Sequence, residues 1–199
     1  MEAIITKTDV YKFDELPEES KQFAIEKFRE NNLDYEWYEF TYEDARECGK
    51  QIGIDIDKIY FSGFWSQGDG ACFEGSYSYA KRGLQAIKYH APKETELHRI
   101  ALELQKIQRK NFYRLEASVK HSGHYYHEMC TDITVDENYY GNYIGGEAEE
   151  IVIELLRDFM CWIYKSLENE YDYLQSDEQI IETIECNEYN FTLDGEIHS

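Results

Sequence analysis

Residues 58–80, KIYFSGFWSQGDGACFEGSYSYA, contain two runs of β-forming residues separated by a glycine-containing turn. Aromatic, β-branched and small residues dominate both runs, and the glycines at positions 68 and 70 fall between them. Such runs on either side of a glycine turn are typical of a β-hairpin. The stretch therefore predicts two neighbouring strands of an antiparallel sheet.

A second hairpin is predicted after residue 114. Leu115, Ala117 and Val119 alternate with polar residues, which is the two-residue period of a half-buried strand. After a turn at residues 121–123, we expect the return strand to include Tyr125 and to place alternate residues on one side. The two hairpins together predict an antiparallel sheet of about four strands.

Helical patterns surround both hairpins. Apolar residues recur every three or four positions in residues 17–31, 37–52 and 94–110, which predicts three amphipathic helices. Residues 147–174 include AEEIVIELLRDFMCWIYKSL, which is apolar around most of a helical circumference, so we expect one long helix at the centre of the core. A short helix around residues 180–184 and a terminal hairpin or edge strand complete a single α+β domain, residues 1–199.

The chain is strongly acidic, with 41 Asp and Glu, 20 Lys and Arg and a formal net charge of -21. Such a surface repels phosphate backbones and anionic lipids, so direct binding to nucleic acid or to a membrane is disfavoured. It would attract a basic protein, such as a toxin, a nuclease or a defence protein. The alternative is a surface that is merely well solvated.

The cysteines and the N-terminus favour a cytoplasmic protein. The five cysteines are an odd number with no CxxC pair, which predicts reduced thiols and neither a disulfide framework nor a zinc ribbon. The first residues lack the features of a signal peptide, and no apolar run approaches the roughly 18 residues of a membrane span.

Two stretches are candidates for a ligand site. Glycine at the first hairpin costs strand stability, which is offset either by a tight turn or by the close approach of a ligand, and both interpretations stay open. In the second stretch, His121, His124, His127 and Cys130 are three residues apart; on a strand this spacing separates them, so no metal or other cofactor is predicted. The candidate ligand-binding residues are Trp65, Ser66, Gln67, Asp69, Phe73, Ser76, His121, His124 and His127.

Eighteen tyrosines, many beside carboxylates, are the other unusual feature. Tyrosine provides rigid, amphipathic contact area and is enriched in interfaces, although it also commonly bridges core and solvent. The candidate partner-binding residues are Tyr35, Trp37, Tyr38, Tyr42, Tyr139 and Tyr140.

Three segments carry a resemblance to a known family: the hairpin at residues 61–79, KFDELPEESKQFAIEKFREN at residues 12–31, and IIETIECNEYNFTLDGEI at residues 180–197. With them the chain resembles small uncharacterised bacterial and phage proteins, some labelled antitoxin of a toxin-antitoxin stability system. The resemblance implies a phage or mobile-element context and a binding function, and assigns no role to any residue.

Three functions are compatible with these features. The favoured hypothesis is a non-enzymatic, antitoxin-like or anti-defence inhibitor that mimics a polyanion and binds a basic site on a partner. The alternative is a protein that binds or sequesters a small ligand, such as a nucleotide signal, at the first hairpin. A hydrolase using Asp69 or a histidine is least favoured, because no catalytic motif is present. Homo-oligomerisation stays open.

Overall fold

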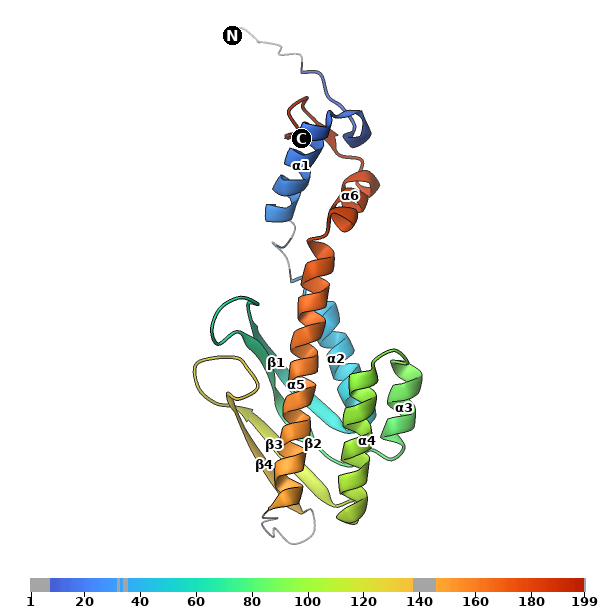
Figure 1. The fold of residues 1–199 in the computed structure, drawn as a ribbon, viewed down its shortest axis with the longest axis vertical. Helices are drawn as coiled ribbons and strands as arrows, with labels where there is room; N and C mark the ends of the chain where they lie inside the picture. The colour runs from blue at the N-terminus through green and yellow to red at the C-terminus, as the bar shows by residue number, and fades with distance from the viewer. Residues whose placement is uncertain (1–7, 32, 34–35, 138–145, 199) are drawn as a thin grey trace, which may run out of the picture. The chain divides into compact units, whose positions relative to one another are not determined.

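A computed structural model describes residues 8–31, 33, 36–137 and 146–198 (Figure 1). The chain divides into two compact units. The sheet unit consists of Tyr38–Glu168, and the terminal unit combines Met1–Trp37 with Asn169–Ser199. The division does not test the predicted single domain, which stays a prediction.

The sheet unit contains a four-stranded antiparallel sheet, as predicted. Its strands lie in the order β1-β2-β3-β4, so both expected hairpins are present and β2 pairs with β3 between them. A bulge interrupts the register of β1 against β2 between Ile56 and Lys58. The bounds are Ile54–Ser62 for β1, Gly70–Tyr77 for β2, Leu115–His121 for β3 and Thr131–Glu137 for β4.

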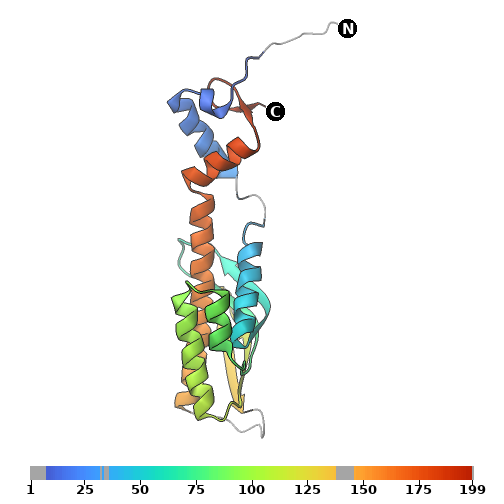
Figure 2. The same ribbon diagram turned by 90° about the vertical axis from the view of Figure 1, so that its right-hand side faces the viewer.

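In the described part of the sheet unit four helices accompany the sheet, and the long C-terminal helix is central to the core. Figure 1 and Figure 2 show α5 lying across one face of the sheet. Phe159 of α5 and Phe73 of β2 are fully buried and meet edge to face, with ring centroids 6.0 Å apart. Lys58, Ser118 and Asp132 are exposed, which is typical of an antiparallel sheet that packs through one face. The helices are α2 Glu39–Ile52, α3 Gly83–His90, α4 Thr95–Lys110 and α5 Glu147–Leu174. Helix α5 belongs to the sheet unit as far as Glu168.

The terminal unit has a separate small core. Apolar side chains of α1 and α6 pack with Phe13 and Phe191, whose ring centroids are 6.0 Å apart. A short pairing of β5 with β6 forms the expected terminal hairpin. The elements of this unit are the 3-10 helix Phe13–Glu15, α1 Glu18–Asn31, α6 Asp177–Cys186, β5 Asn190–Phe191 and β6 Ile197–His198.

The return strand of the second hairpin begins later than predicted. β4 starts at Thr131, so the expectation of a strand that includes Tyr125 is wrong. The Ser122 amide donates to the Cys130 carbonyl at 2.9 Å, and these two residues close a loop. Gly123, with φ of +104°, supplies the left-handed turn inside it. The residues before Thr131 alternate as in a strand, but they lie in this loop and not in the sheet.

Helix α3 was not predicted, because only Ile87 and Gly83 are buried in its eight residues and they give no clear period. No helix among residues 8–31, 33, 36–137 and 146–198 is long and apolar enough to cross a bilayer.

Candidate functional site: the paired loops and the acidic terminal unit

The two hairpin loops of the sheet unit, residues 63–69 and 122–130, pack against each other and are called the paired loops here. A Cβ atom on Gly70 would lie 2.5 Å from the Cβ of His127, and one on Gly68 would lie 2.7 Å from Cδ1 of Tyr125. Real Cβ atoms do not approach other atoms so closely. The two glycines therefore allow the second loop to approach the first.

Asp69 holds the first of the paired loops in shape. Its Oδ2 accepts hydrogen bonds from the backbone amides of Trp65 at 3.0 Å and Ser66 at 2.7 Å, and its own amide donates to the Ser66 carbonyl at 3.1 Å. From α5, the Tyr164 hydroxyl donates to the Gly63 carbonyl at 3.3 Å. The Asp69 carboxylate thus satisfies backbone amides in the turn.

An open hollow of about 400 Å³ lies between the paired loops. Trp65 and Tyr125, which are 76% and 52% exposed, provide aromatic surface on the same loops. The carboxylates of Asp69 and Glu128 oppose a phosphate-bearing ligand and suit a cationic or neutral one. The lining residues are Gln67, Gly68, Asp69, Tyr125, His127 and Glu128.

Three of the candidate ligand-binding residues, Gln67, Asp69 and His127, meet at this hollow. Trp65 and Ser66 are exposed in the same loop, whereas Ser76 is exposed on β2 and Phe73 lies in the core. Ligand binding by the nine predicted residues stays a prediction.

The histidine at the end of β3 and the two histidines of the second loop have separate surroundings. The His121 ring stacks on Tyr60, with centroids 4.6 Å apart, and its Nε2 lies 3.0 Å from the Tyr125 carbonyl. His124 is exposed. His127 accepts a hydrogen bond from the Met129 amide at 3.1 Å, and its Nε2 lies 3.5 Å from the Cys130 Sγ. The three-residue spacing therefore brings His127 and Cys130 together in a loop, where strand geometry does not apply.

The candidate partner-binding aromatics that the structure describes contribute mainly to packing. Trp37 is buried and meets Tyr171 within the terminal unit, with centroids 5.7 Å apart. Tyr42 is buried in the sheet unit and packs against Tyr38, and burial raises the pKa of its hydroxyl. Tyr35, Tyr139 and Tyr140 lie outside the described residues. A role in partner binding stays a prediction for all six.

Negative charge is concentrated in the terminal unit. Its sequence has 19 Asp and Glu and 5 Lys and Arg, a net charge of -14, whereas the longer sheet unit has 22 and 15, a net charge of -7. Residues 169–199 carry nine carboxylates and no lysine or arginine. Among the described acidic residues of this unit, all except Glu170 are exposed. A running count of charge along the sequence would have revealed the acidic C-terminal segment.

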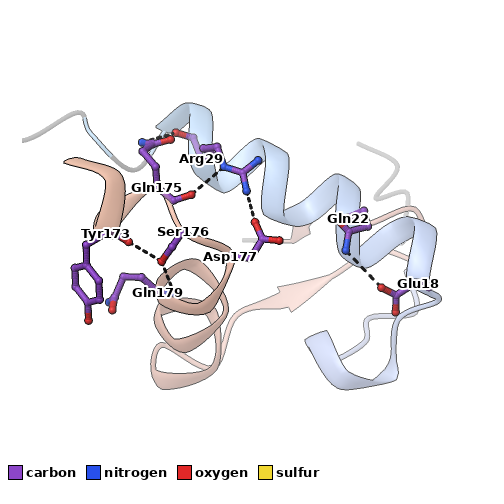
Figure 3. Close-up of polar contacts among 8 residues, drawn as sticks. All are labelled: Glu18, Gln22, Arg29, Tyr173, Gln175, Ser176, Asp177 and Gln179. Carbon is purple, nitrogen blue, oxygen red and sulfur yellow. Dashed lines mark hydrogen bonds and ion pairs between the residues drawn. The ribbon is translucent and has the colours of Figure 1, made fainter. Parts of the chain in front are cut away.

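Some cations of the terminal unit have structural contacts. Figure 3 shows Arg29 of α1 against the start of α6, where its Nε donates to the Gln175 carbonyl at 3.1 Å and its guanidinium pairs with Asp177. Lys12 donates to the Glu188 carbonyl at 2.7 Å. Five cations cannot offset nineteen carboxylates, so the surface of this unit is strongly negative.

Comparison with known proteins identifies the family of the chain. Residues 37–177 match the family described as domain of unknown function DUF8835. The chain belongs to this family. No curated protein and no solved structure matches the chain. The DUF8835 match includes the whole sheet unit with the paired loops, whereas residues 1–36 and 178–199, which form most of the terminal unit, lie outside it.

Proposed function

We propose that the protein is a non-catalytic interaction protein of the cytoplasm, whose acidic terminal unit binds a basic site on a partner protein. The observation that carries the proposal is the concentration of charge, with -14 of the formal -21 in the terminal unit. Carboxylates gathered in this way raise the local negative potential, and that potential attracts a basic surface and accelerates association. An even distribution over the chain would favour simple solvation instead.

The class of partner follows from the same chemistry. A groove that holds the phosphates of a nucleic acid is lined with lysine and arginine, so an array of exposed carboxylates can occupy it as a polyanion would. Nucleases, and the toxins and defence proteins that act on nucleic acid, need such a basic surface. An antitoxin-like or phage anti-defence role is the form of the proposal that the sequence resemblance supports.

Matched charge reversals test where the partner binds. The first variant combines Glu178→Lys, Glu182→Lys and Glu185→Lys on α6, and the control combines Glu39→Lys, Glu43→Lys and Glu47→Lys on α2. All six residues are exposed, and each set includes one residue of a first helical turn. Both variants change the net charge by the same amount, so a difference between them reports the location of the charge.

Each protein serves as bait for an extract of the source cells at about 50 and about 200 mM salt, since added salt screens exposed charges. We expect the wild type and the α2 variant to retain a partner at low salt. The α6 variant should not retain this partner, and high salt should release it from the other two proteins. Equal retention by both variants, retention that ignores salt, or the absence of any partner would contradict the proposal.

The hollow between the paired loops supports a second candidate function, the binding of a small ligand. Its carboxylates favour a cationic or neutral ligand over the nucleotide considered from the sequence. A ligand present at 100 times its dissociation constant would add about 2.7 kcal/mol to the free energy of unfolding. Thermal unfolding with nucleotides and with polyamines tests this candidate, and no change with either set would count against it.

A further inference from the structure

Three side chains of types that can ligate a metal meet where α2 and α3 pack together. Asp44 and Cys48 are four residues apart on α2 and therefore lie on one face of the helix. His90 is the last residue of α3. The Asp44 Oδ1 lies 3.9 Å from the Cys48 Sγ and 3.8 Å from the His90 Nε2, and the three ligand atoms all lie within 4.8 Å of one another.

Close packing of the two helices holds these side chains together. A Cβ atom on Gly83 would lie 2.9 Å from the Gln51 carbonyl, so α3 begins directly against the last turn of α2. His90 lies seven positions after Gly83, and Asp44 lies seven positions before Gln51, which is about 10 Å along each helix. Equal lengths on antiparallel helices bring His90 opposite Asp44. After α3, the His98 Nε2 contacts the Ala91 carbonyl at 2.8 Å and fixes the turn.

The distances among the three side chains are long for direct hydrogen bonds between them. At 3.8 Å, the Asp44 carboxylate and the His90 ring are beyond normal hydrogen-bond distance, and the Cys48 thiol contacts the same carboxylate only at 3.9 Å. Tetrahedral zinc would bring the sulfur and oxygen to about 3.6 Å, and the nitrogen and oxygen to about 3.4 Å. Movements of about 0.3 to 0.4 Å would achieve these two separations.

We propose that Asp44, Cys48 and His90 bind a zinc ion, with a fourth position open to water. Thiolate, imidazole and carboxylate are the ligand types that zinc prefers in proteins, and three protein ligands with water form an open site. The buried Cys48 would be the anchor, and the exposed Asp44 and His90 would close around the ion. The ion would join α2 to α3 within the family-matched region.

The charges around Cys48 suit a cation. Asp44, Glu94 and Glu47 place negative charge around its thiol. Zinc binds cysteine as a thiolate, so binding would release the proton of the Cys48 thiol. These carboxylates would stabilise a divalent ion bound at the thiol. Glu94 is held nearby by a hydrogen bond of 2.9 Å from the Trp162 Nε1.

Cobalt(II) is the direct probe, because it replaces zinc at such sites and absorbs light through a charge-transfer transition when bound to thiolate. The full chain, freed of metal, is titrated with cobalt and then with zinc. We expect one cobalt ion per chain, a thiolate charge-transfer band, displacement by zinc, and a rise in the unfolding temperature with zinc.

Variants assign the ligands. Cys48→Ala should abolish the charge-transfer band, and Asp44→Asn and His90→Ala should weaken cobalt binding at least about tenfold. Because Asp44 and His90 are exposed, their variants should keep the fold even if Cys48→Ala does not. The matched control is Cys130→Ala, which removes a thiol 3.5 Å from the His127 Nε2 and should leave the band unchanged. No band in the wild type, a band that survives His90→Ala and Asp44→Asn at full affinity, or a band lost in Cys130→Ala would overturn the site.

Discussion

At the scale of single residues, the glycines at the first hairpin illustrate a limit of sequence analysis. The sequence left open whether they serve a turn or the approach of another group. The space beside Gly68 and Gly70 is occupied by Tyr125 and His127, which are more than fifty residues away in sequence. A single sequence does not indicate that two loops so far apart pack together, so the hollow between them could not be predicted.

Gly68→Ala should destabilise the protein more than Gly123→Ala. Both glycines have left-handed backbones, with φ of +92° and +104°, so alanine costs about 1–2 kcal/mol at either position. At Gly68 the new methyl would also meet the Tyr125 ring at 2.7 Å, which adds about 1–3 kcal/mol. At Gly123 the nearest atom is the Cys130 Sγ at 3.8 Å. Urea unfolding measures the difference, and equal losses would show that the paired loops do not pack as described.

At the scale of elements, a strong apolar period predicted helices and strands correctly where no turn interrupted it. The long apolar pattern of α5 and the alternation of β3 both correspond to observed elements. The residues before β4 alternate in the same way, but Gly123 and the hydrogen bond from Ser122 to Cys130 turn them into a loop. Helix α3 is short and has few buried residues, so its pattern was too weak.

Arg99 links two of these elements and makes stability depend on pH. Its Nη2 lies 2.6 Å from Glu96 on α4 and 2.5 Å from Asp158 on α5. The hydrogen bond from Arg99 holds the pKa of Glu96 below its usual 4.5. A lowered folded-state pKa contributes stability above about pH 4.5, and this contribution is lost as the pH falls through the folded-state value.

Arg99→Met should therefore lower the free energy of unfolding by up to about 1 kcal/mol at neutral pH, since the side chains are partly exposed and water screens the ion pairs. The difference from wild type should shrink when the pH falls below 4.5. Urea unfolding at neutral pH and below pH 4.5 measures this difference in the free energy of unfolding. Lys106→Met is the matched control, because the ion pair of Lys106 with Glu103 stays within α4. A loss that is the same at both pH values would show that Arg99 acts through packing alone.

At the scale of the whole molecule, the distribution of charge matters more than its total. The sequence predicted an acidic protein with a basic partner, and the acidic segment 169–199 can be identified from the sequence alone. It did not show that residues 1–37 join this segment in one unit, because that depends on the packing of α1 with α6 around Phe13 and Phe191. The predicted partner-binding aromatics, by contrast, include two that are buried, Trp37 and Tyr42.

The most direct measurement is the association rate between the protein and the purified partner that the wild-type bait retains, followed at increasing salt. Electrostatically steered association slows steeply with ionic strength. The account predicts a steep decrease for the wild type and for the α2 variant, and a slower, nearly salt-independent rate for the α6 variant. The same salt dependence in both variants, or none in the wild type, would contradict binding through the acidic terminal unit.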